Sequence, residues 1–131
     1  MTVESAISDA EWRLPGTPAA DNEIDPRWQA IIEVGEYVET DPDPIWSFVD
    51  RWGRNADADL RAAIAACLLE HLLEHHFDLI FPRVERAVVA STAFADCFAR
   101  TWALGQSKLP TNLPRFDALK AGIAHLPANE R

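Results

Sequence analysis

The stretch DADLRAAIAACLLEHLLEHHFD, residues 57–78, decides the fold of this chain. At 100° per residue, its apolar side chains fall on two opposite faces of a helix. The first face holds Leu60, Ile64, Cys67, Leu68 and Leu72, and the second holds Leu69, Leu73 and Phe77. Because water is excluded from both sides, the sequence predicts a central buried helix over residues 58–76.

Helical periodicity also dominates the segments on either side, and no segment alternates with period two. Asp25-Pro26 and Asp43-Pro44 each place an acidic N-cap before a proline in the first turn, where the missing N–H costs nothing. The caps of three later helices are expected at Asp78, at Ser91 or Thr92, and at Asn112. Short connectors make sequential helices antiparallel. The sequence therefore predicts an all-α fold of five to six helices in stacked antiparallel hairpins.

Two of these helices have a clear apolar stripe, which we expect to face the core. The stripe of the helix after Asp25 is formed by Trp28, Ile31, Ile32, Gly35 and Val38. The stripe of the helix after Asp43 is formed by Ile45, Phe48, Val49 and Trp52. Trp46 lies about 100° from that second stripe, so we expect it to be partly exposed.

The chain is long enough for one domain with a real core, because 48% of its 131 residues are hydrophobic. Residues 1–24 are mixed polar and contain Pro15, Gly16 and Pro18, which is typical of a loosely ordered N-terminal arm. We therefore expect an arm over residues 1–24 and a single α-helical domain over residues 25–131.

Neither an export signal nor a membrane span is expected, since the N-terminus MTVESAISDAEW lacks basic and apolar regions and charge interrupts every apolar run. Cys67 and Cys97 lie in apolar helical patterns, where a free cysteine behaves as a small hydrophobe and not as a nucleophile. Two such cysteines make no disulfide scaffold, so the sequence favours the reducing cytoplasm.

The formal net charge of −9 is concentrated in the first half of the chain. Residues 1–60 hold 14 acids and four arginines, whereas residues 61–131 hold seven acids and eight basic residues. An acidic surface repels phosphate backbones, so we expect no binding of nucleic acid, and it attracts basic proteins over a distance. The alternative is that the charge serves solubility alone.

Residues 42–75 contain the helix PDPIWSFVDRW and then the run from Asp57 to Ala65, which is similar to the pattern D-x-x-x-R-x-x-A-A. This segment resembles a single unit of the HEAT-repeat family. The resemblance implies a helical hairpin that contributes a binding surface and no catalysis.

The spacing His71-x-x-Glu74-His75 matches that of inverted-motif zinc peptidases, in which two His bind zinc and Glu acts as the base. A small metal-binding protein or metallohydrolase is therefore the alternative function. These histidines are also typical of a helix end, where the dipole and hydrogen bonds stabilise them. We expect this structural role, with no metal and no cofactor.

The acids of the first two predicted helices are expected to lie along one side of the domain, together with Trp46. These candidate partner-binding residues are Glu33, Glu36, Glu39, Asp41, Asp43, Trp46 and Asp50. A tryptophan surrounded by charge has the composition of a binding hot spot. The sequence thus predicts a non-enzymatic protein–protein interaction module with a basic partner. Its most concrete form is a bacterial immunity protein that neutralises a cognate toxin.

Overall fold

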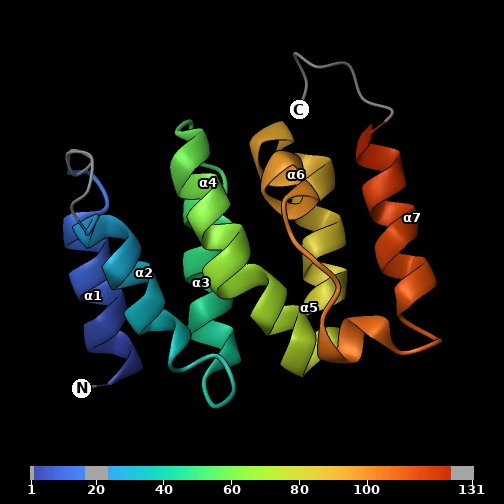
Figure 1. Ribbon diagram of the computed structural model, residues 1–131, viewed down its shortest axis with the longest axis horizontal. Helices are drawn as coiled ribbons and strands as arrows, with labels where there is room; N and C mark the ends of the chain where they lie inside the picture. The colour runs from blue at the N-terminus through green and yellow to red at the C-terminus, as the bar shows by residue number, and fades with distance from the viewer. Residues whose placement is uncertain (1, 17–23, 125–131) are drawn as a thin grey trace.

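The computed structural model describes residues 2–16 and 24–124, and every regular element within those ranges is helical (Figure 1). In chain order the elements are α1 (Val3–Arg13), α2 (Pro26–Gly35), α3 (Pro42–Trp52), α4 (Ala58–Ile64), the π-helix η1 (Ala65–Leu69), α5 (Glu70–Ala90), α6 (Thr92–Ala99), the 3₁₀-helix η2 (Gly105–Lys108) and α7 (Leu113–Ala124). The all-α prediction is confirmed.

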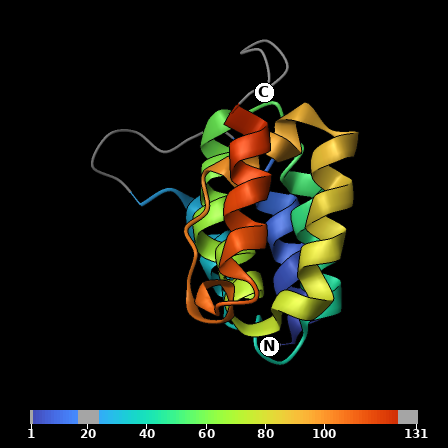
Figure 2. The same ribbon diagram turned by 90° about the vertical axis from the view of Figure 1, so that its right-hand side faces the viewer.

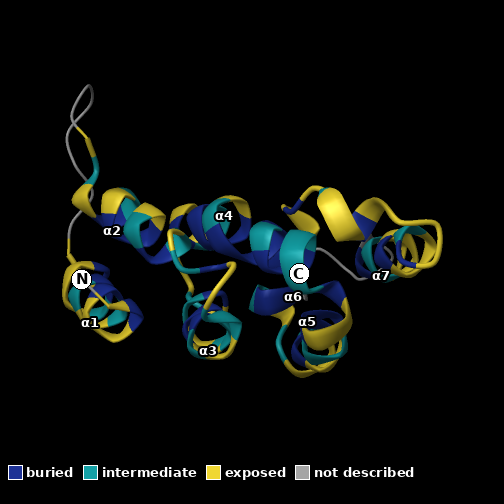
Figure 3. Cartoon of the chain, turned by 90° about the horizontal axis from the view of Figure 1, so that it is seen from below, coloured by how far each residue is buried: buried dark blue, intermediate teal, exposed yellow. Residues whose placement is uncertain are grey.

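The helices lie in two layers, which Figure 3 shows end on. One layer contains α1, α3 and the later part of α5, and the other contains α2, α4 and α6. Successive helices run in opposite directions, so the chain forms the stacked antiparallel hairpins α1–α2, α3–α4 and α5–α6 (Figure 1). The helix α7 packs against α6 and η2 at the far end of the stack, where it faces the viewer in Figure 2.

The predicted central helix is present and buried, although it is not one regular α-helix. It runs through α4, η1 and the first turns of α5, and both Leu68 and Leu72 have no accessible surface. Leu69, Leu73 and Phe77, on the opposite face, are also completely buried. The π-helix interrupts the regular spacing of 3.6 residues per turn within this segment.

The central segment ends at His76, whose φ of −140° and ψ of 46° are not helical. The expected cap at Asp78 is wrong, because the chain reverses direction two residues earlier, without a loop. The amide of Phe77 donates to Oε1 of Gln106 at 3.0 Å, and Nε2 of Gln106 donates to the carbonyl of His75 at 2.8 Å. One glutamine side chain therefore satisfies the backbone groups on both sides of the break.

The other helix starts agree with the sequence in part. Asp25 caps α2 as expected, since its side chain accepts from the amide of Arg27. The start expected at Asp43-Pro44 is wrong, because α3 begins at Pro42 after Asp41. Two prolines fit in the first turn because no amide there has an intrahelical acceptor. Ser91 caps α6 as expected, by accepting from the amide of Phe94.

The expectation of a loosely ordered arm is wrong for residues 3–13, which form α1. Thr2 and Ser5 form a reciprocal capping box, and Val3, Ala6 and Ala10 are buried where α1 packs on α2 and α3. These buried side chains of α1 are small, so their helical spacing is easily overlooked in the sequence. Residues 17–23 of the expected arm, and residues 125–131 of the expected domain, lie outside the described residues.

Arginines at two places join helices of the stack. Arg27, which is buried, pairs with Asp25, Asp57 and Asp59 and so ties the start of α2 to the start of α4. The Nε atom of Arg61 lies 2.9 Å from Oδ2 of Asp96 on α6. In the D-x-x-x-R pattern, Asp57 therefore caps α4 while Arg61 reaches the next hairpin.

In the part of the chain that the structure describes, no helix combines the length and the apolar character that crossing a membrane requires.

Candidate functional site

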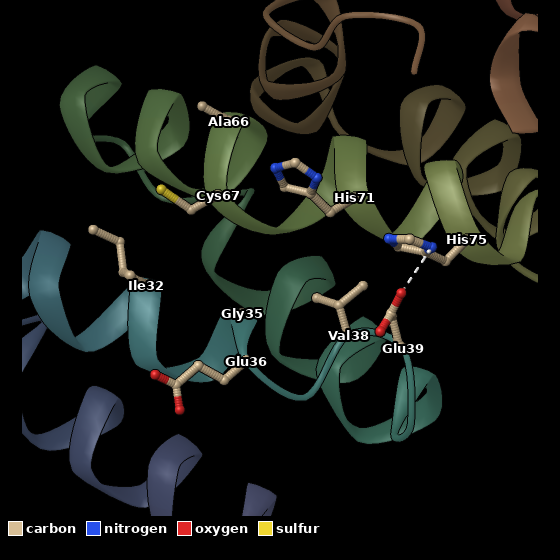
Figure 4. Close-up of a pocket in the computed structure, with 9 residues that line it drawn as sticks. All are labelled: Ile32, Gly35, Glu36, Val38, Glu39, Ala66, Cys67, His71 and His75. Atoms are coloured by element: carbon tan, nitrogen blue, oxygen red, sulfur yellow. Dashed lines mark ion pairs between the residues drawn. The ribbon is translucent and has the colours of Figure 1, made fainter. Parts of the chain in front are cut away.

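A groove of about 500 Å³ lies between α2 and the segment formed by η1 and the start of α5 (Figure 4). Its walls combine apolar side chains, two carboxylates and two imidazoles. The lining residues are Ile32, Gly35, Glu36, Val38, Glu39, Ala66, Cys67, His71 and His75. Its volume is within the range of about 300–1,000 Å³ that is usual for ligand sites.

Gly35 brings the two walls of the groove into contact. A Cβ atom on Gly35 would lie only 3.2 Å from the carbonyl oxygen of Cys67, so the backbones of α2 and η1 approach more closely than a side chain would comfortably allow. Ile32, one turn earlier on α2, is 48% exposed beside this contact. Its expected place in the core is wrong, because its side chain lines the groove instead.

The wall opposite α2 carries Cys67, His71 and His75 at intervals of four residues, which places them along one edge of the helix (Figure 4). Cys67 is half-buried and packs against the core, so its expected place inside the core is only partly correct. The other members of the same predicted face, Leu60, Ile64, Leu68 and Leu72, are buried as expected.

Glu74 lies between the two histidines. Its Oε1 atom is 2.8 Å from Nδ1 of His71 and 3.5 Å from Nε2 of His75. On the other side of the groove, Oε1 of Glu39 is 3.4 Å from Nδ1 of His75, a contact drawn as a dashed line in Figure 4. His75 is therefore flanked by carboxylates from two separate segments of the chain.

His76 fixes the position of the segment that carries Glu39. Its Nε2 atom lies 3.0 Å from the carbonyl oxygen of Val38 and 3.1 Å from that of Glu39. Because a carbonyl oxygen only accepts, Nε2 of His76 is the donor. The helix break at His76 thus holds the connection between α2 and α3 against the groove.

The acids expected along one side of the domain are divided between different places. Glu36 and Glu39 line the groove beside α2, and Glu33 lies on the same helix. Trp46 and Asp50 instead line a second groove of about 350 Å³ between α3 and α5, in the other layer. Asp41, which stands at the N-cap position of α3 without a capping hydrogen bond from its side chain, and Asp43 complete the set of expected residues.

The second groove is rich in arginine. Arg54, Arg83 and Arg86 line it, with Arg54 paired to Asp50 at 2.9 Å and Arg83 paired to Asp43 at 2.9 Å. The charges of Asp43 and Asp50 are therefore locally balanced. Trp46 is half-buried there and packs edge-on against Phe94, with ring centroids 5.7 Å apart.

The geometry gives little support to a metal site at His71, Glu74 and His75. No set of three or more His, Cys, Asp or Glu side chains in residues 2–16 and 24–124 is arranged to hold a metal ion. The hydrogen bond between Glu74 and His71 uses ligand atoms that such a site would need.

Neither cysteine is prepared for nucleophilic chemistry. Burial raises the pKa of the Cys97 thiol to about 12, with a further contribution from the charge of Asp96. Burial and the charge of Glu70 also raise the pKa of the Cys67 thiol above its ordinary value. Because the thiolate is the reactive form, both side chains are held in the unreactive state.

The sequence did not predict the apolar wall of the groove, nor the role of the Gln106 side chain at the break that ends the central segment. Ile32 and Cys67 were assigned to the core, and nothing in the sequence marked Gln106, 29 residues beyond Phe77, as a hydrogen-bonding partner of the helix break. For Gly35 a signal did exist, since a glycine inside an apolar stripe often marks close approach of another backbone.

The chain matches no known protein-family model, no curated protein and no solved structure.

Proposed function

We propose that this protein is a non-enzymatic interaction module that binds a basic partner protein through the acidic edge of α2. We define this acidic edge as Glu33, Glu36, Glu39 and Asp41, which lie on α2 and its connection to α3. Asp43 and Asp50 are left out of it because arginines of the chain already pair with them.

One observation carries the proposal. Within residues 2–16 and 24–124, no lysine or arginine pairs with any residue of the acidic edge, and Glu39 contacts the imidazole of His75. Four carboxylates close together in the chain repel one another, and a partner that neutralises them relieves this cost. A basic protein is therefore the favoured kind of partner.

The acidic edge suits rapid association. Complementary charge raises association rates well above those of neutral surfaces, and the effect weakens as salt shortens the Debye length from about 10 Å at 0.1 M to about 3 Å at 1 M. A small acidic protein that must intercept a basic toxin benefits from such steering. The most concrete form of the proposal is therefore a bacterial immunity protein acting in the cytoplasm.

The proposal also includes a role for the segment that resembles a HEAT unit. The hairpin of α3 and α4 coincides with the segment that resembles a HEAT unit, and the other hairpins stack on either side of it. We assign the chain a HEAT-like role because solenoids of this kind use helix edges as binding surfaces.

The test compares association kinetics. A binding protein is isolated from the source cells with the full chain as bait, and its association rate is measured against the wild type and against Glu33→Lys with Glu36→Lys. The double reversal should slow association about tenfold or more at low salt, and the difference should shrink in 1 M salt.

The matched control reverses two acids that pair with arginines of the second groove, Asp43→Lys with Asp50→Lys. Since arginines of the chain already pair with both, this control should change the rate much less. If neither salt nor Glu33→Lys with Glu36→Lys changes the association rate of the partner, the proposal is wrong.

A further inference from the structure

The groove beside the acidic edge has both apolar walls and carboxylates. It can therefore contact both the apolar stem and the charged end of one long side chain. Ile32, Val38 and Cys67 provide apolar wall, while Glu36 and Glu39 are exposed carboxylates of the same lining. No lysine or arginine is among the residues that line this groove. Such a site favours an occupant with an apolar stem and a cationic head.

We infer that this groove receives an arginine side chain of the basic partner. This inference rests on the proposed function and names the group by which the partner is recognised. An arginine lays its methylene groups along apolar surface and keeps its charged head in a polar environment. Its planar guanidinium also matches carboxylates in a two-point geometry that lysine cannot provide.

The π-helix supplies a second, independent observation. The amide of Glu70 donates to the carbonyl of Ala65, five residues back, and the next residue, Ala66, is exposed and lines the groove. π-Helical turns are also frequent at functional sites.

The walls are held in place before any partner arrives. Gly35 sets the close contact of α2 with η1, and His76 fixes the carbonyls of Val38 and Glu39. A preformed groove loses less entropy when it binds a side chain than a mobile surface does. A groove whose walls are fixed in this way is suitable as a binding hot spot. Arginine is one of the residue types that are enriched at binding hot spots.

The experiment is a titration followed by amide NMR shifts of the full chain. The probe is the tripeptide Gly-Arg-Gly with both ends blocked, and the comparison peptides carry lysine or glutamine at the central position. The arginine peptide should cause saturable shifts at Gly35, Cys67 and His71 with a Kd on the order of millimolar. The lysine peptide should bind at least about threefold more weakly, and the glutamine peptide should not saturate.

Two variants make the result specific. Glu36→Gln with Glu39→Gln should weaken the arginine peptide about tenfold, whereas Asp43→Asn with Asp50→Asn, at acids paired with arginines of the second groove, should leave it unchanged. Circular dichroism confirms that each variant is folded. Absence of saturable shifts, equal binding of the lysine peptide, or shifts confined to the second groove would each overturn the inference.

The two proposals can fail separately. If the isolated partner is slowed by the reversal of Glu33 and Glu36 but the arginine peptide does not bind, the acidic edge is functional and the arginine groove is wrong. If the arginine peptide binds while the partner ignores both the reversal and salt, the proposed function fails, and the inference about the partner's arginine fails with it.

Discussion

At the scale of single residues, Leu68 shows how tightly the middle of the stack is packed. It is completely buried in η1, which contacts helices of both layers. Leu68→Ala should lower the free energy of unfolding by about 2–5 kcal/mol, because the neighbouring helices cannot collapse into the cavity. Urea denaturation measures this loss. Leu79→Ala, at a partly exposed position of α5, is the matched control and should cost much less.

His71 and His75 provide a second test at this scale. Their ring nitrogens already contact Glu74, and His75 also contacts Glu39, so both histidines have partners without a metal ion. Treating the purified protein with a chelator should leave the thermal midpoint unchanged, as measured by circular dichroism. A large fall in the midpoint, restored by added zinc, would support the metal-binding alternative instead.

The apolar spacing predicted the burial of single residues correctly inside the stack and wrongly at two positions of the groove. It placed Leu68 and Leu72 in the core correctly. The same spacing placed Cys67 and Ile32 there incorrectly, although Leu68 lies in the same π-helix as Cys67 and Ile32 lies in a regular α-helix. Both side chains belong to the groove, so the deviations from the pattern coincide with the candidate site.

At the scale of elements, the break inside α5 depends on Gln106. This side chain accepts from the amide of Phe77 and donates to the carbonyl of His75. Gln106→Ala would leave both backbone groups without these partners, and it should lower the free energy of unfolding by about 1–3 kcal/mol. Hydrogen exchange at Phe77 should become faster at the same time.

A graded variant separates this hydrogen-bonding role from simple packing. Gln106→Glu keeps the acceptor for Phe77 and removes the donor for His75, so its loss of stability should lie below that of Gln106→Ala. If both variants were as stable as the wild type, Gln106 would not hold the break.

Element boundaries followed the sequence where the capping residue is local. Asp25 and Ser91 cap their helices as the sequence predicts. The break at His76 could not be predicted this way, because its hydrogen-bonding partners Gln106 and Val38 lie far away in the chain. The helix α1 was missed for a different reason, since alanines form much of its buried face and leave a weak apolar pattern.

At the scale of the whole molecule, the distribution of charge has more meaning than the net charge of −9. Sequence analysis located the acidic excess in the first half of the chain but could not show which acids are neutralised. Folding brings Arg83 to Asp43 from 40 positions further along the chain, while Glu36 gains no such partner in the described part of the structure. This difference distinguishes the acidic edge, on α2 and its connection to α3, from the acids that arginines of the chain neutralise.

The most direct test of that central claim is a hydrogen-exchange footprint of the chain with its isolated basic partner. If the acidic edge binds the partner, exchange should become slower at the end of α2, in the connection that carries Glu39, and in η1, and it should stay unchanged in α1 and α7. Slower exchange confined to the second groove, between α3 and α5, would place the binding surface in the other layer and show that the acidic edge does not bind the partner.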